Sequence, residues 1–160
     1  MAPRPAWKGY LKLSLVTCAV ELTNVVGHAE KVLIATGSRP VRPALFAFER
    51  PEICDSDEIV VLDRLPTRMV VVGAGVIGCE YASIFAALGI DVTLVDGRDR
   101  IMPFLDREVG ERLIVELRRM GVKERFGVDV KACEVVADND VRLTLSTGEV
   151  LEADCVLVAA

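Results

Sequence analysis

The most regular pattern of hydrophobic and polar positions lies in the middle of the chain. Met69–Val72 is a continuous apolar run, typical of a strand buried on both faces of a parallel sheet. The glycine-rich segment 73–78 then leads into a helix predicted over Val76–Leu88, with Gly89 placed to end it. A second buried strand is expected over Ile90–Asp96. This segment therefore predicts a strand, helix and strand unit.

The pattern continues to the end of the chain. Asp106 can cap a second helix, about Arg107–Met120, which Gly121 ends. The rest is rich in strands, predicted at Val122–Phe126, Val128–Val136, Val141–Ser146, Val150–Leu151 and Cys155–Ala159, with a turn at Thr147-Gly148. This order predicts an α/β fold, a Rossmann-type domain with a parallel sheet and an antiparallel hairpin insertion.

The first part of the chain is less regular. Residues 9–24 are predicted to form one or two strands, and Val32–Ala35 a buried strand that runs into a turn at Thr36-Gly37. Two prolines then stiffen an extended crossing segment, up to about residue 45. Further on, Ser56 is expected to cap a short helix that ends before Pro66.

Composition and charge narrow the functional class. The chain has 160 residues, is 52% hydrophobic and only 5% aromatic, so its core must be mainly aliphatic. A net charge of −5 argues against a nucleic-acid partner, which requires a basic face. Residues 1–50 hold seven Lys/Arg and three Asp/Glu, whereas residues 51–160 hold twelve and twenty-one. Such a shift often marks a domain boundary.

The cellular setting is predicted from two further features. No apolar run approaches the roughly 18 residues that span a bilayer, so no membrane partner is expected. The five cysteines form no C-x-x-C pair and no metal-ligand spacing. Widely spaced cysteines suit reduced, mostly buried thiols, and we expect a cytoplasmic protein without a metal site.

The glycine-rich segment carries the first candidate chemistry. Gly73 permits a sharp turn, Gly75 lets a pyrophosphate approach the backbone, and Gly78 lets the helix pack closely on its strand. The predicted site also includes the intervening residues Ala74, Val76 and Ile77. The helix N-terminus would offer unpaired N–H groups and a partial positive charge to phosphates. A tight turn without a ligand is the alternative for the bare motif.

An acid at the end of the second strand completes the nucleotide-binding pattern. Asp96 lies 18 residues beyond Gly78, where a carboxylate can accept both ribose hydroxyls and repel a 2′-phosphate, which favours NAD. Arg98 and Arg100 could instead accept a 2′-phosphate, or lie in a solvated loop. Glu80 either benefits from the helix dipole or points toward the reactive end of the cofactor. Together these residues predict binding of NAD(P).

Three stretches resemble one family. VLIATGSRP resembles the segment that closes the FAD domain of pyridine nucleotide–disulfide oxidoreductases, and VVVGAGVIGCEYASIFAALG resembles the start of their NAD(P)-binding domain. CVLVAA resembles the segment that ends that domain, cut off before its glycine. The resemblance covers nearly all of Lys31–Ala160 in the family's order and spacing, whereas residues 1–30 match only loosely.

The resemblance implies roles for single residues. Glycines 73, 75 and 78 would hold the pyrophosphate, Asp96 the adenosine ribose, and Ile77 and Glu80 would lie by the nicotinamide. Thr36 and Gly37 would touch FAD in a full-length enzyme. GCEYASIF and RDRIMPFLD most resemble the flavin-dependent transhydrogenases, with dihydrolipoamide dehydrogenases as the nearest alternative. The implied reaction passes hydride from NADPH to the flavin and from the flavin to NAD⁺.

The resemblance also implies a division of the chain. Residues 1–45 would be the C-terminal remnant of an FAD-binding domain with the crossing segment, and residues 46–160 an NAD(P)-binding domain truncated at its last strand. The family's FAD pyrophosphate motif would precede Met1, so we expect these residues alone to bind no FAD and to be inactive. Unpaired strand edges at the truncation would invite self-association. The alternative from another class is a stand-alone NAD(H)-binding module without catalysis.

Overall fold

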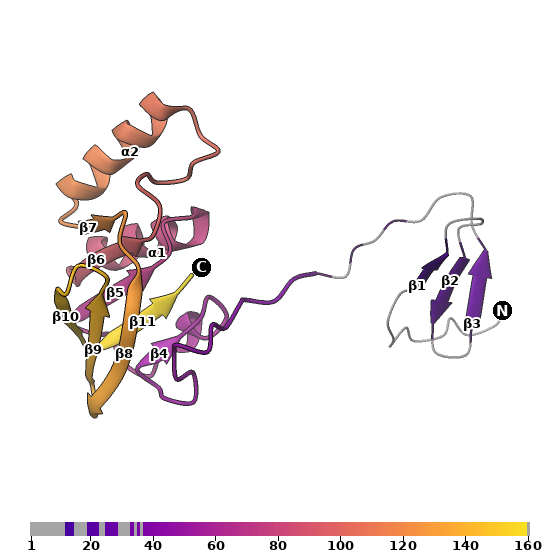
Figure 1. The fold of residues 1–160 in the computed structure, drawn as a ribbon, viewed down its shortest axis with the longest axis horizontal. Coiled ribbons are helices and arrows are strands. Elements are labelled where there is room, and N and C mark those ends of the chain that lie inside the picture. The colour runs from indigo at the N-terminus through magenta and orange to yellow at the C-terminus, as the bar shows by residue number, and fades with distance from the viewer. Residues whose placement is uncertain are drawn as a thin grey trace. The chain divides into compact units, whose positions relative to one another are not determined.

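The chain divides into two compact units, Met1–Ser38 and Arg39–Ala160. The computed structural model describes residues 12–14, 19–22, 25–28, 33, 35 and 37–159. The first unit contains an antiparallel sheet of three short strands in the order β1 (Lys12–Ser14), β2 (Ala19–Leu22) and β3 (Val25–His28) (Figure 1). The strands expected within residues 9–24 are therefore present, and β3 adds a third that the pattern did not predict.

The strand predicted over Val32–Ala35 is wrong at the two positions that the structure describes. Leu33 and Ala35 belong to no strand, and Leu33 is 89% exposed. Val32, Ile34 and Thr36 lie outside the described residues. An apolar run becomes a buried strand only where neighbouring strands pair with it, and none of the recorded strand pairings includes Leu33 or Ala35.

The second unit is built on a five-stranded parallel sheet. Its order is β4 (Ile53–Cys54), β11 (Cys155–Val158), β5 (Arg68–Val72), β6 (Asp91–Asp96) and β7 (Lys123–Phe126). The central strand β5 pairs with β11 on one side and β6 on the other. The predicted apolar run at Met69 thus becomes the middle of the sheet, as its burial on both faces requires.

Different layers cover the two faces of this sheet (Figure 1). Met69 and Val71 pack in one core with α1 (Val76–Ala87) and α2 (Arg107–Arg119). Val70, between them in sequence, packs in a second core with the antiparallel sheet β8 (Val130–Ala137), β9 (Asp140–Leu145) and β10 (Val150–Ala153). Because side chains alternate along β5, this strand contributes residues to both cores. The predicted antiparallel insertion has three strands.

Both helices are bounded by the capping residues that the sequence predicts. At the end of α1, Gly89 has a φ of 84°, its N–H donates to Ala86 O, and Ile90 N–H donates to Phe85 O. This is the paired arrangement that a left-handed glycine permits after a helix. Asp106 caps α2 by accepting the N–H of Glu108 at 2.9 Å. Gly121, with a φ of 95°, follows that helix.

The predicted cap at Ser56 is wrong. The short helix is a single 3₁₀ turn, η1 (Ile59–Val61), and its cap residue Glu58 makes no side-chain cap. The neighbouring Asp55 carboxylate accepts the N–H groups of Asp57 and Glu58 at 2.9 and 3.1 Å. Arg42 holds the same carboxylate with a 2.7 Å hydrogen bond from Nε. An ionised, anchored acceptor outcompetes a neighbouring hydroxyl.

The crossing segment belongs with the second unit by its packing. Phe46 is buried in the core under the antiparallel sheet, and Arg42 reaches Asp55. The boundary between compact units therefore falls before these residues, after Ser38. The assignment of residues 1–45 to a former FAD domain stays a prediction.

The helices α1 and α2 have 12 and 13 residues. Within the described part of the chain, no helix is long and apolar enough to cross a membrane. The same residues contain no group of three or more His, Cys, Asp or Glu side chains that could hold a metal ion.

A buried carboxylate joins the two sheets. Asp154 lies between β10 and β11 and accepts the N–H groups of Thr67 and Arg68 at 2.8 and 3.1 Å. The Thr67 hydroxyl and the Arg68 guanidinium donate to it as well. Burial alone would raise the pKa of Asp154, but these hydrogen bonds outweigh it and lower the pKa to about 2. The ionised carboxylate thus fixes the start of β11 to the start of β5.

We expect Asp154→Ala to lower the free energy of unfolding by about 2–3 kcal/mol, because it leaves buried donors unpaired. The folded pKa lies below the ordinary value of 3.8, so the stabilisation is present above about pH 4 and is lost as the pH falls toward 2. Urea denaturation between pH 7 and 2 measures both effects. Asp138→Ala, at a side chain 96% exposed, is the control and should change stability by less than about 0.5 kcal/mol. Equal acid sensitivity of wild type and Asp154→Ala would contradict the assignment.

Candidate nucleotide-binding site

The glycine turn joins the carboxyl end of β5 to the start of α1. Gly73 has a φ of 110°, a conformation that favours glycine, and its N–H donates to Val95 O at 2.8 Å. Gly75 is the N-cap of α1, and no side chain caps the helix there. The first turn of α1 carries no acidic residue either. The helix therefore begins with N–H groups and a partial positive charge that its own side chains leave unmatched.

The other two glycines of the motif have different roles. A Cβ atom added at Gly78 would lie 1.8 Å from Gly73 O, so α1 packs directly on the backbone of the turn. A Cβ atom added at Gly75 would meet nothing within 4 Å. Gly78 is thus required by the fold itself. The open space at Gly75 leaves the backbone accessible from outside, as a bound phosphate requires.

We expect Gly78→Ala to destabilise the protein by about 3 kcal/mol or more, because the added methyl group meets a backbone oxygen that cannot move away alone. Gly75→Ala should cost about 1 kcal/mol or less, since its methyl group enters open space at an N-cap. Chemical denaturation of the two variants beside the wild type makes the comparison. Equal losses at both positions would show that the turn is not packed as described.

Asp96 ends β6 beside the glycine turn, where the sequence predicted it. Its carboxylate is 7% exposed and accepts the N–H of Ala74 at 2.6 Å. Arg98 donates to it from its backbone N–H and from Nε, both at 2.8 Å, and from Nη2 at 2.6 Å. Burial alone would raise the pKa of Asp96, but the hydrogen bonds from Arg98 and Ala74 lower it. Asp96 is therefore an ionised side chain held against the turn.

The pairing of Arg98 with Asp96 is the feature that sequence reasoning missed. The sequence predicted that Asp96 binds a ribose, and that Arg98 either binds a 2′-phosphate or lies in a solvated loop. The Arg98 guanidinium donates a bidentate pair of hydrogen bonds to both carboxylate oxygens of Asp96. The Arg98 side chain is nevertheless 51% exposed. The signal in the sequence was an arginine two residues after a strand-ending aspartate.

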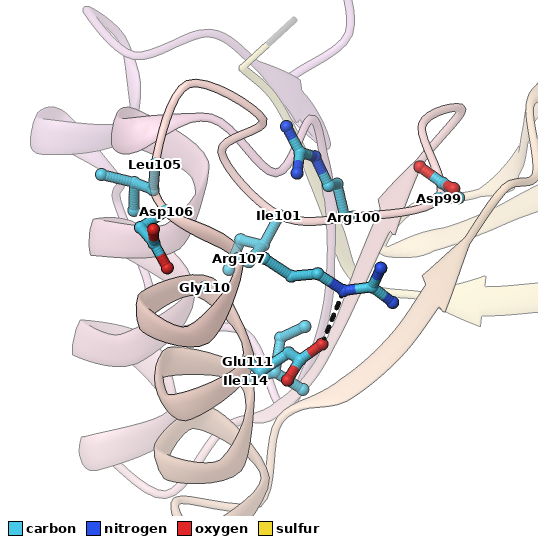
Figure 2. Close-up of a pocket in the computed structure, with 9 residues that line it drawn as sticks. All are labelled: Asp99, Arg100, Ile101, Leu105, Asp106, Arg107, Gly110, Glu111 and Ile114. Carbon is cyan, nitrogen blue, oxygen red and sulfur yellow. Dashed lines mark hydrogen bonds and ion pairs between the residues drawn. The ribbon is translucent and has the colours of Figure 1, made fainter.

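The loop after Asp96 packs back on the glycine turn. Met102 N–H donates to Ala74 O at 3.1 Å, and Arg100 donates to Pro103 O within the loop. A cavity of about 410 Å³ lies between this loop and the first turns of α2, and Arg107 and Glu111 pair beside it at 2.9 Å (Figure 2). Arg100 lines that cavity, whereas Asp96 and the glycine turn do not. Arg98 is not among the residues that line it.

The remaining predicted residues divide between the two units. Val76, Ile77 and Glu80 are exposed on α1, with Ile77 46% exposed. Gly37 is exposed with a φ of 75° and belongs to the first unit. Thr36 lies outside the described residues. The structure thus brings together the glycine turn, Ala74, Asp96 and Arg98.

A parallel sheet with a glycine turn at the carboxyl end of its central strand, and an acid at the end of the next strand, defines the Rossmann class of α/β proteins. The family model for pyridine nucleotide-disulphide oxidoreductases matches residues 12–160. The chain belongs to this family of oxidoreductases.

The chain is similar to curated relatives named soluble pyridine nucleotide transhydrogenase. It is 46% identical to that of Ectopseudomonas mendocina over 129 residues, 81% of this chain and 28% of the relative. It is 47% identical to that of Mycobacterium tuberculosis over 140 residues, 88% of this chain and 29% of the relative. The chain thus spans less than a third of the length of these relatives.

Solved structures agree on the fold. An HOCl-induced flavoprotein disulfide reductase from Escherichia coli matches with a TM-score of 0.72 and 28% identity, over 89% of this chain and 33% of that one. A ferredoxin reductase from Rhodopseudomonas palustris matches with a TM-score of 0.74 and 24% identity, over 89% and 37%. At that identity the second likeness concerns the fold alone.

Proposed function

We propose that this chain is the NAD(P)-binding part of an FAD-dependent oxidoreductase that transfers hydride between NADPH and NAD⁺. The observation that carries the proposal is the uncapped start of α1 with open space at Gly75. Similarity to transhydrogenases supports the particular reaction. In this proposal residues 1–45 derive from an FAD-binding domain and residues 46–160 form the nucleotide-binding domain.

The pyrophosphate of the nucleotide would lie over Gly75. No side chain caps the first turn of α1, and the helix dipole favours an anion there. Gly73 and Gly78 shape the turn, and neither needs to touch the ligand. The buried Asp96 fixes the turn through Ala74 N–H. The residues present therefore fit a dinucleotide.

The adenosine ribose would lie beside the Asp96–Arg98 pair. A bare carboxylate would repel a 2′-phosphate, but the paired guanidinium neutralises it at close range. Two of the five guanidinium N–H groups serve the pair, which leaves others for a phosphate or a hydroxyl. Such a paired site suits both NAD(H) and NADP(H), as hydride transfer between the two requires.

The reactive end would lie along the exposed face of α1. Ile77 and Glu80 are exposed there and would border the nicotinamide. FAD, when bound in a longer chain, would supply the group that accepts and returns the hydride. Thr36 and Gly37 would contact it by family resemblance.

A stand-alone NAD(H)-binding module is the second candidate. It is favoured by the fact that the unit Arg39–Ala160 contains both the glycine turn and the two cores that support it. The two proposals differ in flavin dependence. NADPH-driven reduction of an NAD⁺ analogue by the longer protein with FAD supports the enzyme, and nucleotide binding without that activity supports the module.

We expect the chain to bind NADH and Gly75→Val to weaken binding by about tenfold or more, because the branched side chain fills the space kept for the pyrophosphate. Isothermal titration calorimetry measures both affinities. Asp138→Ala, far from the turn in sequence and 96% exposed, should bind as the wild type does. No heat of binding for folded wild type would refute the proposed site.

Arg98→Ala should change nucleotide preference. It exposes an unpaired carboxylate to the ribose, so we expect NADPH affinity to fall about tenfold and NADH affinity to change less than about threefold. Titration of each nucleotide at fixed ionic strength gives the two ratios. Arg119→Ala removes the same charge from the exposed end of α2 and is the control. Equal weakening of NADH and NADPH by Arg98→Ala would overturn the role in selectivity.

A further inference from the structure

Two cysteines meet on neighbouring strands of the parallel sheet. Cys54 lies in β4 and Cys155 begins β11, and their sulfur atoms are 3.9 Å apart. Both residues face the helix-covered side of the sheet and are nearly buried, at 3% and 4% exposure. Cys155 is level with Met69 of β5, whereas Cys54 ends β4 opposite Leu157, level with Val71. β11 lies between β4 and β5, and the cavities that the two cysteines line include no residue of the glycine turn.

Each thiol borders a cavity. Cys155 lines one of about 490 Å³ together with Arg64 and Asp154, and Cys54 lines a second of about 270 Å³ with Glu58. The two cavities share Pro51, Leu62 and Asp63. The larger cavity thus brings a small polar molecule to Cys155, whose sulfur lies 3.9 Å from that of Cys54.

The two thiols are chemically unequal. The hydrogen bond between the two thiols lowers the pKa of Cys155 and outweighs its burial, which raises it. The positive charge of Arg64 lowers it further, against the negative charges of Asp154 and Glu52. The same pairing raises the pKa of Cys54, and so does burial. Elsewhere, burial raises the pKa of Cys79 and of Cys133 to about 11. Among these four cysteines, Cys155 is the one favoured as a thiolate, and Cys54 keeps its proton.

We propose that Cys155 and Cys54 form a dithiol–disulfide site that is oxidised by small hydroperoxides entering beside Cys155. The Cys155 thiolate attacks the peroxide, so that a sulfur–oxygen bond forms, the oxygen–oxygen bond breaks, and the leaving oxygen takes a proton from water. Cys54 then attacks the Cys155 sulfur, and the sulfenic oxygen leaves as water with the Cys54 proton. The two sulfurs lose two electrons, which the peroxide gains, and an external dithiol reverses the reaction by exchange.

The fold allows the approach that the second step needs. The sulfur atoms must close from 3.9 Å to about 2 Å. Cys54 lies opposite Leu157 in the register, so closure shifts β4 toward the start of β11. β4 has two residues and lies at the edge of the sheet, paired with β11. A short edge strand with one partner can make such a shift without breaking the rest of the sheet.

Mass spectrometry of the whole chain in a Cys18→Ser background tests this inference, since Cys18 lies outside the described residues. The protein is treated with hydrogen peroxide, blocked with an alkylating agent without reduction, and digested. We expect a Cys54–Cys155 linked peptide, lighter than the two thiol peptides by two hydrogens and lost after dithiothreitol. Cys79 and Cys133 should stay alkylatable, with oxidation at least about tenfold slower.

Two variants separate the steps. Cys54→Ser removes the second thiol, so a sulfenic acid should accumulate at Cys155 and be trapped by dimedone. Cys133→Ser is the matched control and should form the same linked peptide at the wild-type rate. Oxidation of Cys133 as fast as that of Cys155, or no linked peptide in folded wild type, would overturn the proposal. The readout is independent of nucleotide binding, so it does not depend on the proposed function.

Discussion

The close approach of α1 to the backbone of the glycine turn is the constraint on which the rest of the second unit depends. A Cβ atom at Gly78 would be 1.8 Å from Gly73 O, so no other residue type fits while the helix keeps its place. That contact sets where α1 begins, and hence where its unpaired N–H groups point. It also brings Ala74 N–H to Asp96, so the turn and the end of β6 are held as one piece. Nucleotide binding, as proposed, would use geometry that the fold already requires.

The sequence predicted the parts of the fold that local rules control. The apolar run at Met69, the glycine after each helix and the aspartate before α2 each act within a few residues, and all three appear as expected. The failures occurred where a distant partner decides. The carboxylate of Asp55, not the hydroxyl of Ser56, accepts the N–H of Glu58, because Arg42 of the crossing segment holds that carboxylate in place. Leu33 lies in an apolar run that predicted a buried strand, but in the described part of the chain no strand pairs with it.

In the candidate site, too, the sequence predicted the features that local residues control and missed those that depend on a distant contact. The glycine motif and Asp96 could be read from spacing, because each depends on the strand and helix that carry it. The fork between Arg98 and Asp96 could not, because it depends on the conformation of a loop whose path is fixed by Met102 against Ala74. This matters for specificity. An isolated carboxylate repels a 2′-phosphate, whereas a carboxylate paired with a guanidinium has no net charge, although the sequence is the same.

The two ends of the parallel sheet carry different chemistry because they are stabilised differently. At the carboxyl end of β5, the turn leads into α1, whose first N–H groups no side chain caps. At the amino ends, Asp154 consumes the N–H groups of Thr67 and Arg68, so the backbone there is closed to anions. Cys155 follows Asp154 directly, and its proposed redox partner Cys54 belongs to the edge strand β4. A change of redox state there would act first on the segment that leads into the sheet from residue 39, because β4 is where that segment joins it.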